Sequence, residues 1–211
     1  MLYPAASWLN ALYLEYKDAY KNCILNDKDP LETIEIYEYT QATTHEEYVE
    51  YFIKVGDEEY EPAYPTAEDI ENGEVLYYTR KLIEKRFVLD CLERFKREYQ
   101  CYFDKKFLLT YYLVTEALLM ADSRVKNLML ATWGKQRRSY VDVKTGYTVT
   151  TNNYIFYPIF YDMDTMLGLD NTGVDRFNYY DEDTDSTIYN GDEVLWNFVR
   201  DALADELTQH Y

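Results

Sequence analysis

Two acidic motifs, Asp122-Ser-Arg-Val-Lys-Asn127 and Asp162-Met-Asp-Thr-Met-Leu-Gly168, enclose the stretch of sequence that decides the fold. Between them, residues 128–133 and residues 154–161 indicate strands, whereas residues 135–153 are polar and rich in turn-forming side chains. The stretch therefore predicts a small antiparallel hairpin with one acidic motif at each outer end.

Pairing of these strands would bring Asp122 and Asn127 towards Asp162 and Asp164. Carboxylate and amide oxygens are the ligands that Mg²⁺ prefers, so the motifs predict a magnesium site. The alternative is that Asp122 and Asn127 only cap local backbone at a helix end. The second acidic motif favours the metal site. Asp162 and Asp164 share one face of an extended strand, so either is a candidate ligand.

Helices are expected on both sides of the hairpin. Residues 105–121 are apolar nearly all round and predict a buried central helix that Asp104 caps. Residues 31–39 fit either a short strand or a helical turn, and Thr66 caps a short turn that Gly73 ends. Further helices are expected at residues 5–24, 46–55, 74–100 and 192–210.

Composition limits the class of protein. Of the 211 residues, 47% are apolar, which indicates a globular chain with a proper core. The net charge of −18, from 39 acidic and 21 basic residues, argues against nucleic acid or an anionic membrane as the main partner. No uncharged apolar run of ~18 residues and no signal peptide are found, so a cytosolic or cytosol-assembled protein is expected.

The chain contains 25 tyrosines, spread along its whole length. Tyrosine combines apolar area with a polar tip, which suits interfaces. A compositional habit of the source genome is the alternative.

The cysteines and histidines do not form a recognisable catalytic or zinc site. Cys23, Cys91 and Cys101 lack Cys-x-x-Cys spacing and are expected to be reduced core thiols. The two histidines, His45 and His210, support neither a zinc site nor a Ser-His-Asp arrangement.

An acidic loop near the C-terminus imitates an EF-hand calcium loop. Asp181, Asp183 and Asp185 occupy positions one, three and five, and Asp192 occupies position twelve. Position six is Ser186, where the sharp turn requires Gly, and Asp192 is shorter than the usual bidentate Glu. A solvated acidic loop is favoured over a calcium site.

The spacing Asp122-x-Arg124-x-x-Asn127 resembles that of a protein-kinase catalytic loop. In that loop the Asp orients the hydroxyl nucleophile, the basic residue helps to neutralise the transferring phosphate, and the Asn holds a metal. In kinases a short hairpin then leads to a second metal-binding Asp followed by Gly, and residues 161–168 occupy that place here.

The likeness is closest to the spore-coat CotH family of atypical kinases, whose second motif usually reads Trp-Asp-aromatic-Asp followed by apolar-Gly. This chain has Tyr161-Asp-Met-Asp and Leu-Gly168, preceded by Tyr157-Pro-Ile-Phe, and it resembles the family over residues 103–173.

The CotH resemblance implies a role for each matching residue. Asp122 would be the catalytic-loop carboxylate and Arg124 would contact phosphate. Asn127 and either Asp162 or Asp164 would hold Mg²⁺.

The chain departs from the kinase pattern in its first hundred residues. Kinases bind ATP under a β-rich N-terminal lobe that has a glycine-rich loop and a lysine on a strand. Before Asp104 the only glycines are Gly56 and Gly73, and no lysine is centred in a convincing strand. The chain is therefore interpreted as a C-lobe alone, a fragment, or a scaffold that has lost the chemistry.

Residues 161–173 read YDMDTMLGLDNTG, and Asn190-Gly191 and Leu195-Trp196 follow an acidic aromatic loop. This arrangement resembles segments of large virion proteins of tailed bacteriophages. The resemblance implies a tail- or collar-associated component of the virion, assembled in the host cytoplasm.

Together these features predict an α+β fold, mostly helical, that resembles the C-terminal lobe of a CotH-type kinase. The predicted division is a helical region at residues 1–103 and a lobe-like region at residues 104–211, in one compact unit. The favoured function is a structural or interaction protein, a pseudokinase-like scaffold whose partners are other protein subunits. The alternative is an ATP- and Mg²⁺-dependent phosphotransferase.

Overall fold

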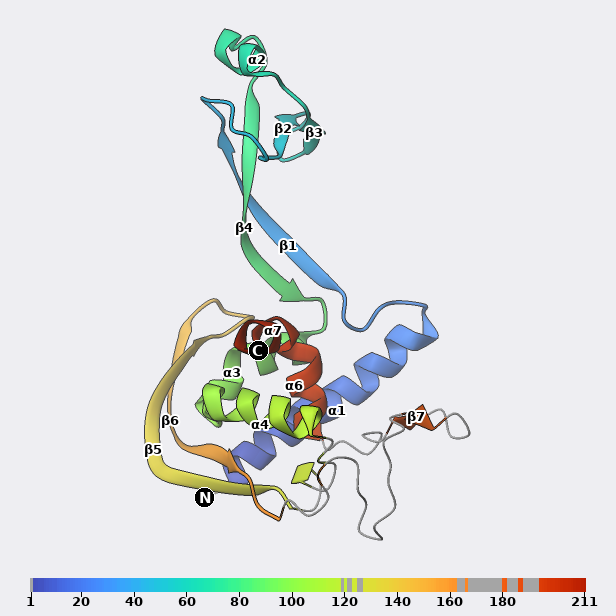
Figure 1. Cartoon of the computed structure of the whole chain (residues 1–211), viewed down its shortest axis with the longest axis vertical. Helices are drawn as coiled ribbons and strands as arrows, with labels where there is room; N and C mark the ends of the chain where they lie inside the picture. The colour runs from blue at the N-terminus through green and yellow to red at the C-terminus, as the bar shows by residue number, and fades with distance from the viewer. Residues whose placement is uncertain are drawn as a thin grey trace. The chain divides into compact units, whose positions relative to one another are not determined.

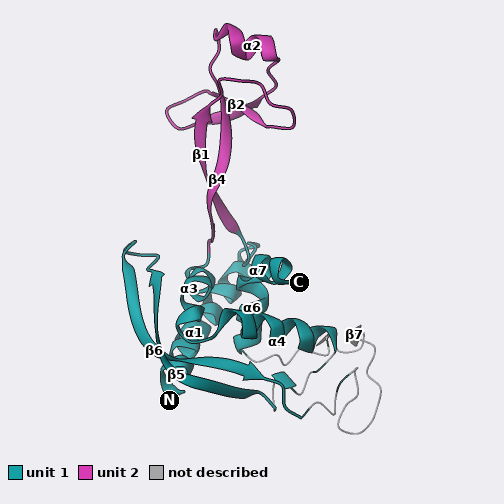
Figure 2. Cartoon of the chain, turned by 60° about the vertical axis from the view of Figure 1, so that its left-hand side comes forward, with its two compact units in different colours: residues 1–32, 89–211 teal, residues 33–88 magenta. Residues whose placement is uncertain are grey.

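The computed structural model describes residues 2–118, 120, 123–124, 127–162, 166, 180–181, 186–187 and 194–211. The chain forms two compact units, unit 1 comprising Met1–Glu32 and Leu89–Tyr211 and unit 2 comprising Thr33–Val88 (Figure 2). The sequence of unit 2 is thus inserted into that of unit 1. This grouping differs from a division at residue 103, because the N-terminal helix belongs with the C-terminal part of the chain.

Unit 1 contains helices and an antiparallel hairpin that curves round them (Figure 1). Its elements are α1 (Tyr3–Leu25), α3 (Asp90–Glu98), the 3-10 helix η1 (Tyr99–Cys101), α4 (Lys105–Ala117), β5 (Met129–Val141), β6 (Thr148–Ile159), β7 (Tyr180–Asp181), β8 (Ser186–Thr187), α6 (Val194–Ala202) and α7 (Ala204–His210). The α+β class is confirmed. Within the described ranges, no helix has the length and apolar character needed to cross a membrane.

The core of unit 1 is built from aromatic rings. Phe95 of α3 is fully buried and stacks on Trp8 of α1 and Phe198 of α6, with ring centroids 5.4 and 5.0 Å apart. Trp8 also donates a hydrogen bond from Nε1 to the buried Glu98 Oε2 at 2.7 Å, which satisfies both polar groups. These contacts hold α1, α3 and α6 together, although α1 and α3 are separated in sequence by unit 2.

Helix α4 is the buried helix that the sequence predicts. Asp104 Oδ1 accepts a hydrogen bond from the N–H of Phe107 at 3.1 Å, which confirms the predicted cap. The helix ends at Ala117, earlier than predicted. Its buried side chains are Leu108, Leu109, Tyr111, Tyr112 and Thr115.

The hairpin of β5 and β6 is longer than predicted, because residues 135–153 are mostly strand. Polar side chains pair across it: Ser139 lies opposite Thr150, with their hydroxyl oxygens 3.0 Å apart. The turn between the strands is short, and Asp142 Oδ1 accepts a hydrogen bond from the N–H of Thr145 at 2.8 Å. Side chains along most of β5 and the first half of β6 alternate between exposed and partly buried positions. This alternation, and not apolar content, marks the polar residues as strand.

Unit 2 is an antiparallel sheet with one short helix. Thr66 and Asp69 form a capping box at the start of the helix, and Gly73 ends it with a φ of 65°, which confirms the predicted short turn. The strand order in the sheet is β1-β4-β2-β3. The elements are β1 (Thr33–Gln41), β2 (Tyr51–Lys54), β3 (Tyr60–Ala63), α2 (Ala67–Asn72) and β4 (Tyr77–Phe87).

The prediction of one long helix at residues 74–100 is wrong, because this segment is β4 followed by α3. Lys85 lies opposite Glu35 of β1, and Lys81 lies opposite Glu38. Pairs of opposite charge directly across a sheet stabilise it by ~0.2–1 kcal/mol each. This long-range pairing outweighs the helix propensity of the basic residues.

Three other boundaries differ from or refine the sequence analysis. The helix predicted at residues 46–55 is wrong, since this segment is a loop followed by β2. Residues 31–39 belong mainly to β1, so the strand alternative is the correct one. The C-terminal helix is interrupted at Leu203, which separates α6 from α7.

The cysteines agree largely with the prediction. Cys91 and Cys101 are buried free thiols, and Cys23 is a partly buried free thiol. Burial raises the pKa of Cys91 to about 11, so this thiol stays protonated and unreactive at neutral pH.

Candidate functional site

The structure describes only part of the predicted metal sites. Asn127 is partly buried just before β5, and Asp162 is exposed just after β6 with a φ of 51°. Met129 pairs with Ile159, so Asn127 and Asp162 lie at the same open end of the hairpin. Of the predicted calcium ligands, the structure describes Asp181, which is the last residue of β7. The predicted site residues outside the described part of the chain are Asp122, Asp164, Asp183, Asp185 and Asp192.

No group of three or more His, Cys, Asp or Glu side chains that could hold a metal ion is found within the described ranges. The predicted Mg²⁺ and Ca²⁺ sites both depend on residues outside those ranges, so they stay predictions.

Arg124, which the kinase resemblance places on phosphate, is completely buried. Its Nε donates a hydrogen bond to Thr115 Oγ1 at 2.8 Å, and its Nη2 donates to the carbonyl of Tyr112 at 3.0 Å. Nη2 also pairs with Glu116 Oε2 at 2.6 Å. The guanidinium lies 4.3 Å from the centre of the Tyr112 ring. Arg124 therefore ties the segment that follows α4 back to α4.

Because the guanidinium of Arg124 is used inside unit 1, we expect no tight binding of Mg²⁺-ATP. Isothermal titration of the protein with Mg²⁺-ATP should give no heat at millimolar nucleotide. Binding in the tens of micromolar that is lost in Asp162→Ala or Asp164→Ala, but kept in the surface control Asp57→Ala, would contradict this expectation and support the phosphotransferase.

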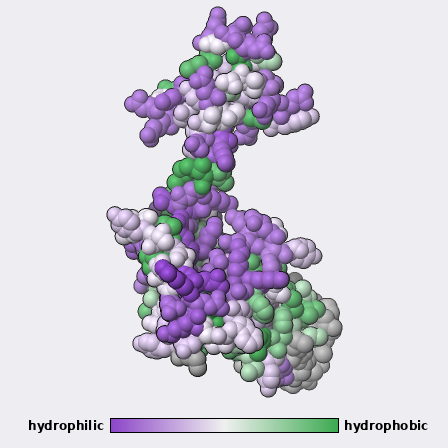
Figure 3. All heavy atoms as spheres, turned by 90° about the vertical axis from the view of Figure 1, so that its left-hand side faces the viewer, coloured by the Kyte–Doolittle hydropathy of each residue, from purple (hydrophilic) through white to green (hydrophobic). Residues whose placement is uncertain are grey.

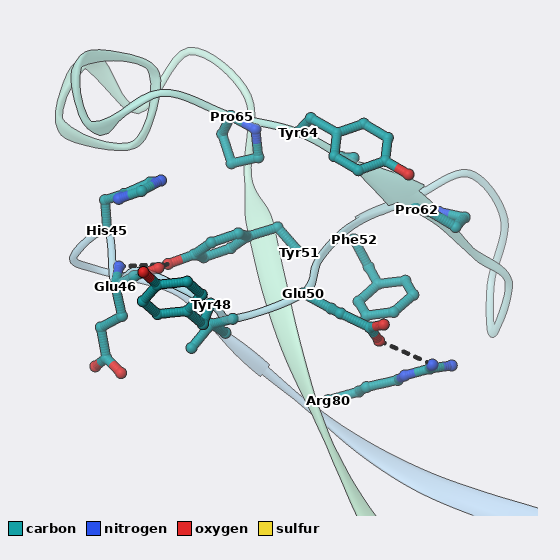
Figure 4. A pocket seen from close by; sticks show the side chains of 12 residues that line it. His45, Glu46, Tyr48, Glu50, Tyr51, Phe52, Pro62, Tyr64, Pro65 and Arg80 are labelled. Carbon is teal, nitrogen blue, oxygen red and sulfur yellow. Dashed lines mark hydrogen bonds and ion pairs between the residues drawn. The ribbon is translucent and has the colours of Figure 1, made fainter.

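The structure reveals a different candidate site, a pocket of about 460 Å³ in unit 2 (Figure 4). Its walls come from the loop before β2, from β2 itself, from β3 and the segment that follows it, and from Arg80 of β4. Aromatic and proline side chains dominate the lining, among them His45, Tyr48, Tyr51, Phe52, Tyr64 and Pro65.

Tyr51 and Phe52 are the buried aromatic residues of the pocket, with 5% and 4% exposure. The hydroxyl of Tyr51 accepts a hydrogen bond from the N–H of Glu46 at 2.6 Å, which fixes the loop before β2 against the strand. The ring of His45 stacks on Tyr51 at 5.5 Å, with an angle of 18° between the ring planes. This side of the pocket is thus held by ring contacts and a backbone hydrogen bond.

A second aromatic cluster braces Phe52. Tyr39 of β1 meets Phe52 edge to face at 5.5 Å and stacks on Tyr60 of β3 at 3.7 Å. Tyr60 in turn meets Tyr78 of β4 at 5.3 Å. Rings from all four strands therefore support the pocket, and we expect it to be formed before any ligand binds.

An ion pair closes one end of the pocket. Arg80 Nη2 lies 2.9 Å from Glu50 Oε2 (Figure 4). The guanidinium lies over the rings of Phe52 and Tyr37 at 4.6 and 4.3 Å. Desolvation acts to lower the pKa of Arg80, but the hydrogen bond with Glu50 and the nearby Tyr37 raise it above its usual value. The charge of Arg80 is therefore already matched by Glu50.

Two exposed tyrosines border the pocket. Tyr48 is 101% exposed and Tyr64 is 95% exposed, although both carry large apolar rings. Tyr48 also has a φ of 67°, a conformation that is uncommon for a bulky residue and that concentrates at functional sites. Exposed tyrosines beside a preformed aromatic pocket are typical of a binding surface.

The sequence analysis missed this pocket because it placed a helix over residues 46–55. The available signal was the density of tyrosine between residues 48 and 64, together with Pro62 and Pro65.

Comparison of the chain with family models, with curated proteins and with solved structures finds no match in any of the three. The resemblances to CotH-type kinases and to phage virion proteins therefore stay predictions, and function is argued from the residues of the pocket.

Proposed function

We propose that this protein is a structural or interaction protein and that the pocket of unit 2 is where a partner protein docks. The observation that carries the proposal is the pair of exposed rings, Tyr48 and Tyr64, beside a braced aromatic pocket. A tyrosine gives a large contact area at a low cost in side-chain entropy, so tyrosines commonly dominate the binding energy of interfaces.

The volume of the pocket admits a protein segment, and the two exposed rings at its border add the wider contact area that a protein partner uses. About 460 Å³ accommodates one or two side chains of an extended segment, as in peptide recognition by aromatic-lined grooves. The net charge of −18 disfavours nucleic acid as that partner.

The resemblance of residues 161–173 to segments of tailed-phage virion proteins supports a virion, in its tail or collar, as the assembly in which the protein functions. In that case the partner is another virion subunit, met in the cytoplasm of the host. The degenerate kinase-like region would then serve as scaffold.

The proposal predicts that binding depends on the two exposed tyrosines. The full chain is used to select ligands from a display library of random twelve-residue peptides, and the affinity of each selected peptide is measured by fluorescence anisotropy. We expect Tyr48→Asn and Tyr64→Ser each to weaken binding of most selected peptides by about tenfold or more. Asn is chosen at position 48 because it tolerates a positive φ.

A matched control separates the pocket from general surface tyrosine. Tyr147 is 76% exposed in the β5–β6 turn of unit 1, and Tyr147→Ser should change affinity less than twofold. Circular dichroism should show unchanged folding for all three variants, since each removes an exposed side chain. If no selected peptide distinguishes the pocket variants from the control, the pocket is not the docking site.

A further inference from the structure

The end of unit 2 that carries the pocket has a strong negative charge, and hydrophilic residues cover much of its surface in Figure 3. Residues 42–76 contain eleven Asp and Glu residues against one basic residue, Lys54, which gives a net charge of −10 from 35 of the 211 positions. The chain as a whole carries −18, so this short segment holds more than half of it. A field of this size attracts a cationic partner and repels an anionic one.

The faces of the exposed rings favour the same type of ligand. A cation over a tyrosine face gains ~0.5–1 kcal/mol at an exposed site, and more where water is excluded. In Figure 4 the rings of Tyr48 and Tyr64 lie on opposite sides of Tyr51, and Tyr64 lies above Phe52, with Glu50 and Arg80 below it. The basic side chain of the pocket, Arg80, is paired with Glu50, so its charge is already matched.

From this charge and this geometry we infer that the docking segment is basic and that it places the guanidinium of an arginine against Tyr48, while an adjacent part of the segment covers Tyr64. The inference rests on the proposed function of the pocket and specifies its partner. Arginine fits better than lysine, because a planar guanidinium stacks on aromatic faces and is less strongly hydrated.

Unit 2 itself provides a precedent for this recognition. The guanidinium of Arg80 packs on Phe52 and Tyr37 while it pairs with Glu50. The partner arginine would repeat this combination with the ring of Tyr48 and with Glu46, a pocket residue whose side chain lies on the Tyr48 side of Tyr51 in Figure 4.

The test uses the peptides that are selected on the full chain and that depend on Tyr48 and Tyr64. We expect these peptides to be enriched in arginine, and replacement of the key arginine by citrulline, its neutral analogue of the same shape, to weaken binding at least tenfold. Replacement by lysine should weaken it about threefold to fivefold. Measurements at 0.15 M salt limit the contribution of distant charges.

A charge-matched pair of variants locates the effect. Glu46→Gln should weaken binding of the arginine peptide about fivefold, whereas Glu71→Gln, which removes the same charge from the exposed surface of α2, should change it less than twofold.

The outcomes distinguish the arginine inference from the docking proposal on which it rests. Pocket-dependent peptides that are neutral, or that bind equally well with citrulline, would overturn the arginine inference and leave the docking proposal intact. A neutral oligosaccharide that competes for the pocket more strongly than the arginine peptide would also overturn it. If binding does not depend on Tyr48 or Tyr64 at all, both ideas fail together.

Discussion

Replacement of Arg124 by alanine is expected to lower the free energy of unfolding of unit 1 by about 3–5 kcal/mol. The side chain is completely buried, and it bonds to Thr115, to the carbonyl of Tyr112 and to Glu116. Its loss removes one donor from Thr115 Oγ1 and one from the carbonyl of Tyr112, and creates a cavity beside α4. Guanidinium chloride unfolding followed by tryptophan fluorescence measures the effect, because all three tryptophans of the chain belong to unit 1.

Two further variants show whether the loss of stability comes from the hydrogen bonds of the Arg124 guanidinium or from its charge alone. Arg124→Lys keeps the charge but cannot donate to Thr115 and Tyr112 with the same geometry, so most of the loss should remain. Arg137→Ala removes an exposed arginine from β5 and should change stability by no more than about 0.5 kcal/mol. A loss below 1 kcal/mol in Arg124→Ala would show that Arg124 is available for another role, such as phosphate binding.

Arg124 also illustrates which features can be predicted from the sequence: the spacing of a motif can, but the burial of its side chains cannot. Its spacing from Asn127 matches a kinase loop, but spacing does not state whether a side chain faces solvent or the interior. The guanidinium is held inside by Tyr112, Thr115 and Glu116 of α4. The backbone of Arg124 is fixed by Trp196, more than 70 residues later, whose indole donates to its carbonyl. Contacts of this range are not visible in a local motif.

Elements defined by local signals were predicted well. The caps at Asp104 and Thr66 and the helix-ending Gly73 all appear in the structure, because each depends on residues within a few positions. Strand β4 of unit 2 was missed for the opposite reason. It is stabilised by pairing with β1, whose residues lie 37 to 54 positions earlier, and its basic residues carry no strong strand signal of their own.

The same reasoning applies to the two candidate sites. The predicted metal site follows from motif spacing, which made Asp122, Asn127, Asp162 and Asp164 easy to single out. The pocket has no motif, because Tyr48 and Tyr64 come together only after β2 and β3 pair. An aromatic docking site of this type is recognised from exposure and ring contacts, which require coordinates.

Replacement of Trp196 by alanine should be as costly as the loss of Arg124, at about 3–5 kcal/mol. Trp196 is fully buried on α6, and its ring stacks on Tyr111 of α4 with centroids 5.4 Å apart. Its Nε1 donates a hydrogen bond to the carbonyl of Arg124 at 3.0 Å. The side chain therefore joins the C-terminal helix to the central helix and to the segment after it.

The contribution of the ring is separable from that of the hydrogen bond. Trp196→Phe keeps an aromatic side chain but leaves the carbonyl of Arg124 without this donor, so we expect a loss of about 1–3 kcal/mol. The matched control is Trp133→Ala, which removes the 85%-exposed tryptophan of β5 and should change stability by no more than about 0.5 kcal/mol. Circular dichroism at 222 nm during denaturant unfolding follows all three variants without relying on indole fluorescence. Equal losses in Trp196→Ala and Trp133→Ala would contradict the assignment of Trp196 to the core, and would place the stability of unit 1 in contacts other than those between α4 and α6.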